Sequence, residues 1–448
     1  MYNIEDIEFS GFLERAFPEE TTMKQRYGAK SVTLQVTDAC NLRCTYCYQI
    51  NKNTNYLKVE DGKKFIDYVL FSDNEYCNSN QSAGMVLEFI GGEPFLAIDQ
   101  IYELTEYAFK QMIAHNHPWL YRTKISICTN GVLYFSPKVQ EYIRRYNQLL
   151  SLSISIDGNK RLHDKCRIFP DGTGSYDLAM TAVNHYKETY GKEPGTKMTL
   201  CPANINDTYD AVISLIETGY TNINFNCVFE EGWTTDHAKI YYQQLKQIGD
   251  YCLNNRHALE VCRLSRFNKT NYQPLDPSYD GNYCGGLGSM ISINHTGKMY
   301  PCIRYMSSSL GTSVPEVVIG DLETGILQKD KYSEIFNIMK SCTRRSQCND
   351  ECFYCPIGQG CGWCSAYNYQ YYGEFSKRTT FTCMMHKAEA LANAYYWNKF
   401  YLQENIPEIF LVHIPTEWAL EIIDQEEWDQ IRHNEELCRS KIAEHNSI

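Results

Sequence analysis

The sequence has no excess of positive charge and no long hydrophobic run. Its 448 residues include 42 Lys and Arg against 54 Asp and Glu, a formal net charge of −12. This balance argues against nucleic-acid binding, which normally shows a basic stripe. No apolar stretch approaches the roughly 18 residues that span a bilayer. The N-terminal residues lack the basic start and apolar stretch of a signal peptide. We therefore expect a soluble cytoplasmic protein that binds neither nucleic acid nor membrane.

Cysteine, by contrast, is abundant, with 20 residues in the chain. Twenty cysteines in 448 residues is a smaller share than the roughly 8–10% typical of a disulfide scaffold. A reducing compartment also disfavours structural disulfides. Scattered single cysteines usually act as small hydrophobic residues of the core. Two dense groups stand apart from them, one at Cys40, Cys44 and Cys47 and the other within residues 284–383. These two groups indicate sets of metal ligands.

Short apolar runs alternate with helical patterns through the first part of the chain. We expect strands at Ser31–Thr37, Met85–Ile90, Lys124–Cys128, Leu150–Ile156, Lys197–Leu200 and Asn222–Val228. The helices expected between and after them are Val59–Phe71, Asp99–His115, Val139–Tyr146, Tyr176–Tyr190, Thr208–Glu217 and His237–Arg256. About six strand–helix pairs with short turns predict a parallel sheet with crossover helices. Polar and glycine-rich segments follow the strands, at the end where α/β barrels gather catalytic groups.

The first cysteine group places three thiols on one short loop after a strand. A structural zinc site normally closes with four ligands, and no fourth lies close in the sequence. A [4Fe–4S] cluster can be held by three cysteines, which leaves one iron open to an outside ligand. The spacing favours an iron–sulfur cluster and leaves zinc as the alternative.

The pattern Cys40-x3-Cys44-x2-Cys47 after one strand, with Gly91-Gly-Glu-Pro94 after the next, resembles the radical S-adenosylmethionine superfamily. The resemblance covers about residues 31–226. It implies a partial (β/α)6 TIM-type barrel and a [4Fe–4S] cluster on the three cysteines. In that family the open iron chelates the methionine part of S-adenosylmethionine, which is cleaved to a 5′-deoxyadenosyl radical.

The resemblance also implies which residues bind S-adenosylmethionine. Tyr46 would lie beside the adenine, and the methionine amino group would be held by Gly91, Gly92, Glu93 and Pro94. Positions that match ribose- or carboxylate-binding residues of relatives are Ser155, Asp157 and Arg167, with Asn130 as a further candidate. The structural alternatives are an inward-facing strand serine, a surface ion pair for the arginine and an ordinary turn at Asn130. No catalytic side chain is assigned.

The second cysteine group resembles the SPASM domain, which carries two auxiliary [4Fe–4S] clusters in peptide- and protein-modifying radical enzymes. By position, one cluster would be held by Cys352, Cys355, Cys361 and Cys383, and the other by Cys284, Cys302 and Cys364. The second of these sets lacks a fourth cysteine unless Cys342 or Cys348 supplies it. Two residues, not the usual three, separate Cys361 from Cys364. A pair of zinc ribbons is the alternative.

These patterns divide the chain into four parts. We expect an N-terminal segment at 1–30, the barrel at 31–262, the auxiliary cluster domain at 263–383 and a helical extension at 384–448. The cofactors implied are three [4Fe–4S] clusters and S-adenosylmethionine.

The resemblance implies a maturase that oxidatively cross-links a cysteine-containing ribosomal precursor peptide, with a thioether as the favoured product and a carbon–carbon bond second. An anaerobic sulfatase-maturing enzyme is the close alternative, but its relatives carry an acidic base where this chain has Ile303. A non-catalytic iron–sulfur electron carrier is the alternative from a different class, and it would have no use for the Gly91–Pro94 motif. The partners implied are the peptide, a flavodoxin- or ferredoxin-type electron donor and a separate leader-recognition protein.

Overall fold

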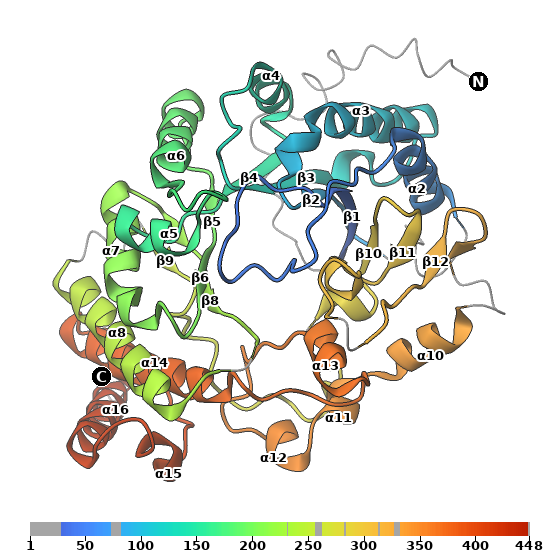
Figure 1. Cartoon of the computed structure of the whole chain (residues 1–448). Coiled ribbons are helices and arrows are strands. Elements are labelled where there is room, and N and C mark those ends of the chain that lie inside the picture. Colours follow the sequence, from blue (N-terminus) through green and yellow to red (C-terminus); the bar gives the residue numbers. More distant parts are fainter. Residues whose placement is uncertain are drawn as a thin grey trace.

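The computed structural model describes residues 28–72, 82–230, 232–255, 262–281, 284–311, 314–326 and 332–446. The N-terminal segment expected at 1–30 lies almost wholly outside these ranges, as does the end of the helix expected to reach Arg256. Within them the predicted fold class is confirmed: helices surround a curved, mainly parallel sheet (Figure 1). No helix of the described part is long and apolar enough to cross a membrane.

The central sheet has nine strands in the order β13-β12-β11-β10-β1-β2-β3-β4-β5. Strands β1 to β5 run parallel, and β10 joins β1 in parallel from the cysteine-rich part of the chain. A separate parallel pair, β6 with β8, continues the arc beyond β5. The strands are β1 Ala29–Thr37, β2 Gly84–Gly91, β3 Thr123–Thr129, β4 Leu150–Ile154, β5 Gly195–Thr196, β6 Met198–Leu200, β7 Asn222–Ile223, β8 Phe225–Cys227, β9 Arg263–Leu264, β10 Met290–Ile293, β11 Lys298–Tyr300, β12 Gly320–Asp321 and β13 Gly325–Ile326.

Helices cover the outside of this arc, as the alternating pattern predicts (Figure 1). Those of the barrel are α2 Val59–Phe71, α3 Ile98–Ala114, α4 Pro137–Tyr146, α5 Lys160–Cys166, α6 Tyr176–Tyr190, α7 Thr208–Thr218 and α8 Thr235–Asn254. The later helices are α10 Ser333–Ser341, α11 Arg344–Gln347, α12 Asp350–Phe353, α13 Ser365–Tyr372, α14 Cys383–Gln403, α15 Thr416–Ala419 and α16 Gln425–His445. Helix α14 is buried on almost every face because it packs against both α8 and α16.

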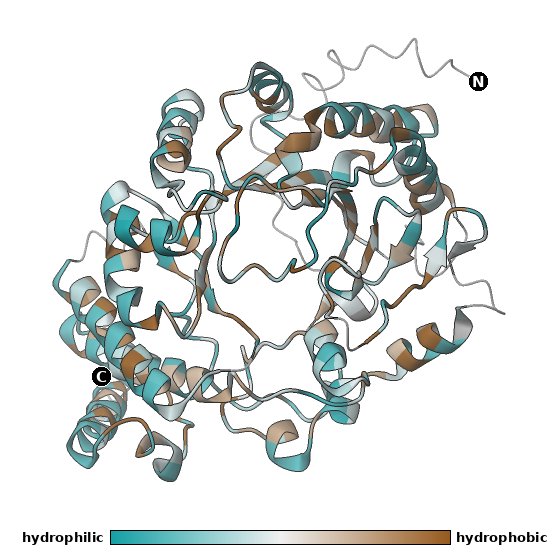
Figure 2. Ribbon diagram, viewed as in Figure 1, coloured by the Kyte–Doolittle hydropathy of each residue, from teal (hydrophilic) through white to brown (hydrophobic). Residues whose placement is uncertain are grey.

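The two faces of the barrel wall differ in chemistry. Outward-facing side chains are apolar and fully buried under the helices, as Leu34, Leu87 and Ile127 illustrate. Figure 2 shows this as brown strands beneath largely teal outer helix surfaces. The side chains in between face inward and are mostly polar; one row, in register across four strands, is Thr33, Glu88, Ser126 and Ser151. A closed barrel is normally filled by bulky apolar side chains. This one keeps a polar interior.

A glycine turn joins the end of β4 to the helices behind it. Gly158 has φ +95°, and a Cβ there would lie 2.5 Å from the backbone Cα of Ala211 in α7. Both the left-handed backbone and the helix contact therefore require glycine. This turn follows Asp157 directly, so α7 packing sets the position of a predicted site residue.

We expect Gly158→Ala to lower the free energy of unfolding by roughly 2–4 kcal/mol, because it adds a backbone clash to left-handed strain. Gly172→Ala is the matched control, since Gly172 has φ +87° but no atom within 4 Å of the added Cβ. It should cost only the strain, about 1–2 kcal/mol. Anaerobic denaturant unfolding of both variants measures the difference, and equal losses would contradict the close helix contact.

Candidate metal centre and cofactor site

The first cysteine loop starts where β1 ends and is held there by the end of β2. Gly92 N donates to Thr37 O at 3.0 Å, and Glu93 N donates to Ala39 O at 2.8 Å. A Cβ on Gly92 would lie 2.3 Å from Ala39 O. The glycine is therefore needed for two backbones to meet side by side at this point. The Gly-Gly-Glu-Pro motif and the cysteine loop form one unit.

The opposite side of the loop is held by the segment after β4. Arg43 N donates to Ile168 O at 2.7 Å, and Thr45 N donates to Cys166 O at 3.0 Å. Asn130, after β3, adds a contact from its Nδ2 to Asn41 Oδ1 at 2.7 Å. Strand ends β2, β3 and β4 thus all contact the loop, which confirms that these polar segments meet at one end of the sheet.

The three thiols of the loop are neighbours and partly exposed. Burial raises the pKa of Cys40 and Cys44, while the positive charges of Lys52 and Arg167 oppose that rise. A [4Fe–4S] cube takes one cysteine per iron. Three neighbouring thiols on one loop with two cations nearby suit such a cluster.

Glu93 faces into the protein rather than toward an open site. Its side chain is 1% exposed and accepts hydrogen bonds from Thr129 Oγ1 at 2.6 Å, Asn130 N at 2.8 Å and Phe95 N at 3.1 Å. Burial raises the pKa of this carboxyl group, and the hydrogen bonds oppose the rise. Its lone pairs are largely used within the chain. Glu93 therefore positions the strand ends β2 and β3, and any ligand amino group at this motif would meet backbone carbonyls first.

Three predicted residues form one buried cluster beneath the loop. Arg167 Nε donates to Asp157 Oδ2 at 2.8 Å and its Nη2 to Oδ1 at 3.3 Å. The Tyr46 hydroxyl donates to the same carboxylate, and the guanidinium lies 5.4 Å from the Tyr46 ring centroid. Asp157 is 3% exposed and Arg167 8%. The alternative of a surface ion pair for Arg167 is therefore wrong, because the pair is buried and couples the cysteine loop to the segment after β4.

Ser155 directly follows β4, where it meets residues that were not predicted to belong to the site. The sulfur of Cys128 on β3 is 3.7 Å from its Oγ. Tyr48, directly after the third cysteine of the loop, lies close to Cys47, Glu88 and Cys128, and burial raises its pKa. Arg304 stacks over the Tyr48 ring at 4.8 Å. Side chains alternate between inward and outward positions along each strand. This alternation could have indicated from the sequence that Glu88 and Cys128 face the barrel interior.

The first auxiliary set converges as the resemblance implies. Cys302 is buried, with Cys284 and Cys364 near enough for their charges to raise its pKa further after burial. A Cβ on Gly286 would lie 3.3 Å from Cys302 Sγ and 3.4 Å from Cys284 Sγ, so a bare glycine backbone faces both sulfurs. The three cysteines lie on separate segments of the chain, with strands β10 and β11 and helix α12 between them in the sequence. The fold therefore brings their thiols together.

The other auxiliary set contains one thiol more than expected. Cys361 lies near Cys352, Cys355 and Cys383, the predicted partners. Cys348 joins them through a side-chain hydrogen bond with Cys352. The thiol of Cys342 instead donates to Ile338 O at 3.3 Å. The structure thus groups Cys348 with the four-cysteine set, away from the set that lacks a fourth ligand.

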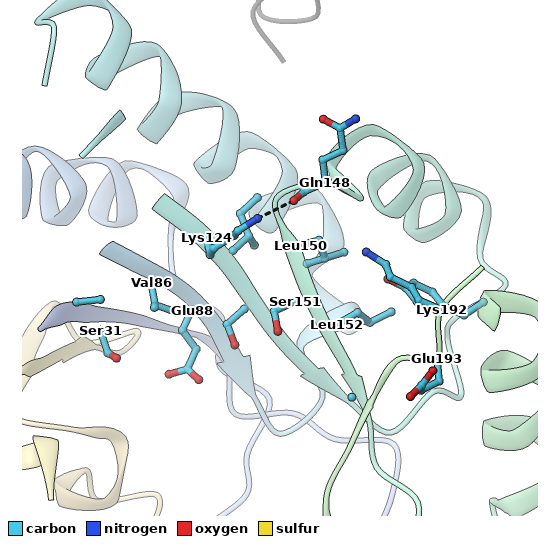
Figure 3. Close-up of a pocket in the computed structure, with 15 residues that line it drawn as sticks. Ser31, Val86, Glu88, Lys124, Gln148, Leu150, Ser151, Leu152, Lys192 and Glu193 are labelled. Atoms are coloured by element: carbon cyan, nitrogen blue, oxygen red, sulfur yellow. Dashed lines mark hydrogen bonds between the residues drawn. The ribbon is translucent and has the colours of Figure 1, made fainter. Parts of the chain in front are cut away.

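One cavity adjoins the auxiliary sets and another lies inside the barrel. The first, of about 550 Å³, is lined by Cys284, Cys361, Cys364, Lys197, Arg266 and His386 among others. The second, of about 600 Å³, is lined by residues of strands β1 to β5. Figure 3 shows the Glu88 carboxylate projecting into it from β2, while Lys124 turns to Gln148 O at 2.8 Å. Burial raises the pKa of Glu88.

Sequence comparison relates the chain to iron–sulfur proteins. The family model for a 4Fe-4S single cluster domain matches residues 27–163. The radical SAM cyclopropyl synthase TigE of Paramaledivibacter caminithermalis is 24% identical over 387 residues, 80% of this chain and 72% of that protein. The cysteine-type anaerobic sulfatase-maturating enzyme of Clostridium novyi is 29% identical over 175 residues, 36% of this chain and 42% of that protein.

Solved structures share the fold. The structure of anSMEcpe with bound AdoMet superimposes with a TM-score of 0.59 at 15% identity, over 89% of this chain and 99% of that one. The chain is therefore similar in sequence to radical S-adenosylmethionine enzymes that modify peptides or proteins, and it shares the fold of anSMEcpe.

Proposed function

We propose that this enzyme cross-links a cysteine-containing ribosomal precursor peptide, forming a thioether between the cysteine sulfur and a carbon atom. The observation that carries the proposal is the convergence of three cysteine sets around one polar barrel. The loop of Cys40, Cys44 and Cys47 lies at one end of it, and both auxiliary sets border the cavity beside it. An electron carrier would need the thiols but not the cradle formed by the ends of β2, β3 and β4.

When the loop cluster and S-adenosylmethionine are bound, they supply a 5′-deoxyadenosyl radical that abstracts a hydrogen atom from an unactivated carbon. The chain's own residues prepare that site. Gly92 and Glu93 hold the cysteine loop against the end of β2. The Asp157–Arg167 pair fixes Tyr46 beneath it. A positioned cradle of this kind keeps the reacting groups in near-attack geometry.

The proposal also includes three [4Fe–4S] clusters. The four-cysteine set that includes Cys361 and the three-cysteine set that includes Cys302 suit two clusters in addition to the one on the loop. Cys348 lies with the four-cysteine set and the thiol of Cys342 donates to Ile338 O, so the three-thiol set would keep an open iron for a substrate thiolate. In thioether formation the radical would take the hydrogen atom of the C–H bond, the thiol would lose its proton to solvent, and an oxidised cluster would accept the remaining electron as the C–S bond forms.

The proposal of a peptide substrate draws on relatives. AlbA of Bacillus subtilis, a subtilosin biosynthesis protein, is 22% identical over 343 residues. The anSMEcpe structure with AdoMet and the Kp18Cys peptide has a TM-score of 0.56. The polar cavity around Glu88, Ser126 and Ser151 would accommodate peptide groups that donate hydrogen bonds. An external flavodoxin- or ferredoxin-type donor and a separate leader-recognition protein complete the proposed partners.

Sulfatase maturation is the second candidate function, favoured by the relatives of that name. The site argues against it. Ile303 follows Cys302 where those relatives carry an acidic base. Glu230 is close by, but its Oε1 accepts from Arg304 Nη2 at 2.7 Å. A carboxylate held in an ion pair is a poor general base, because the pairing favours its deprotonated form and weakens proton uptake.

Mass spectrometry of a cysteine-containing peptide after anaerobic co-expression tests the thioether. We expect a loss of two hydrogens per cross-link and a cysteine that no longer reacts with iodoacetamide. Conversion of that cysteine to an aldehyde would support the sulfatase reading instead. A two-hydrogen loss with the thiol still alkylatable would point to a carbon–carbon bond.

We expect Gly92→Ala to reduce formation of 5′-deoxyadenosine by roughly 10–100-fold, because the added Cβ pushes against Ala39 O and displaces the cysteine loop. Gly191→Ala, with no atom within 4 Å of its added Cβ, is the control and should leave the rate unchanged. The measurement is chromatographic quantification of 5′-deoxyadenosine with dithionite as reductant. An unaffected rate in the Gly92 variant would contradict the proposed role of the motif.

We expect Cys47→Ala to abolish 5′-deoxyadenosine formation and to remove about four irons per chain, the content of one cluster. Cys252→Ala is the control, since Cys252 is 3% exposed within α8 and apart from all three sets. Iron assay and Mössbauer spectroscopy of the reconstituted proteins give the counts. Retention of activity by the Cys47 variant would refute the loop as the cofactor site.

A further inference from the structure

One guanidinium group lies among the thiols of the four-cysteine auxiliary set. Arg378 Nη1 is 3.3 Å from the sulfur of Cys352 and 3.7 Å from that of Cys348, and its Nη2 is 2.9 Å from the sulfur of Cys361. Cysteine sulfurs are the groups whose charges act most strongly on this arginine. An N–H donor binds a thiolate more strongly than a thiol because the acceptor is charged. The arrangement is suited to deprotonated, cluster-bound sulfur.

Packing holds Arg378 in this place. The guanidinium lies 4.1 Å from the Trp363 ring centroid, and the indole N–H of Trp363 donates to Gln347 Oε1 at 3.3 Å. Nε of Arg378 is buried and has no hydrogen-bond partner among the described residues. Burial of a charged guanidinium group costs free energy, and more so when one of its N–H groups has no hydrogen bond. A negatively charged group beside it would offset that cost.

Cys348 is the second unexplained group here. A [4Fe–4S] cluster takes four cysteines, and Cys352, Cys355, Cys361 and Cys383 already supply them. Cys348 contacts Cys352 through a side-chain hydrogen bond, and its sulfur lies 3.7 Å from Arg378 Nη1. A thiol at this position is placed to donate an S–H hydrogen bond to the sulfur of Cys352.

We propose that Arg378 and Cys348 form an outer shell of hydrogen-bond donors around this auxiliary cluster and raise its reduction potential. The inference rests on the proposed function, since it requires the cluster. Reduction adds negative charge to a cluster, and a nearby cation or donor to its sulfurs stabilises that charge. Both residues act through the ligand sulfurs and are positioning residues rather than catalytic ones.

The charges around the other auxiliary set differ. The charge of Arg304 acts on Cys364 and Cys302. Arg304 is also paired with Glu230 at 2.7 Å, and the carboxylate partly cancels its field. The cluster beside Arg378 therefore has the higher potential of the two auxiliary clusters and is the favoured resting place for electrons removed from the substrate.

An EPR-monitored redox titration of the anaerobically reconstituted full chain tests the arginine. We expect Arg378→Gln to keep its iron but to lower the midpoint of one cluster signal while the others stay unchanged. Arg432→Gln is the matched control, because Arg432 also lies over an indole, Trp428, at 5.8 Å, but in α16 away from the cysteines. Unchanged midpoints in the Arg378 variant with full iron content would overturn the proposal.

A series of cysteine-to-alanine variants distinguishes an outer-shell residue from a cluster ligand. We expect Cys348→Ala to retain iron and to lower the midpoint of the same cluster as Arg378→Gln does, whereas Cys352→Ala loses iron or changes its EPR line shape. Cys342→Ala, whose thiol donates to Ile338 O, is the control and should match the wild type. Iron loss in the Cys348 variant equal to that of the Cys352 variant would make Cys348 a ligand and overturn its outer-shell role.

The wild-type iron count distinguishes this inference from the proposed function. About twelve irons per chain are expected for three clusters. A wild-type count of about four would refute both the auxiliary clusters and the outer shell. A count near twelve with no midpoint shift in either variant would refute the outer shell alone and leave the proposed function standing.

Discussion

Two backbone hydrogen bonds, from Gly92 N to Thr37 O and from Glu93 N to Ala39 O, are the constraint on which the site depends. They join the end of β2 to the first residues of the cysteine loop, so the loop cannot move without the sheet. Only glycine at position 92 lets the two backbones approach this closely. Glu93 extends the same constraint to β3 through its hydrogen bonds with Thr129 and Asn130. The cysteines are thereby held against the ends of β2 and β3.

Buried charge completes the cradle. The Asp157–Arg167 pair lies under the loop with the Tyr46 hydroxyl as a third member. Removing one partner of such a pair would leave an uncompensated charge, at a cost of about 3–5 kcal/mol. The auxiliary centres repeat the pattern with arginines facing thiols. Cations close to each cysteine set make thiolates less costly inside the protein and prepare the chain for clusters of negatively charged ligands.

Much of this site could be predicted from residue order, because its ligands lie close in the chain or follow consecutive strands. Parallel strands bring their carboxyl ends to one edge, so the meeting of the Cys40 loop, Gly91–Pro94, Asn130 and Asp157 followed from the alternation of strands and helices. The grouping of Cys284, Cys302 and Cys364 followed from a known spacing. The alternative of a surface ion pair for Arg167 failed because exposure depends on what packs above a residue, here Tyr46 and the loop.

The sequence by itself indicated iron–sulfur clusters and S-adenosylmethionine through a family resemblance, since the thiol spacing and strand-end glycines that carry it are local properties of the chain. Tertiary structure alone decided how long-range neighbours act on those thiols. It turned the Glu93 carboxylate inward, gave the barrel a polar interior and assigned Cys348 to the set of Cys352 rather than to that of Cys302. It also brought Arg378 over Trp363 and against sulfurs far away in the sequence. Side-chain direction and electrostatic environment arise from packing between distant segments, and residue order does not specify that packing.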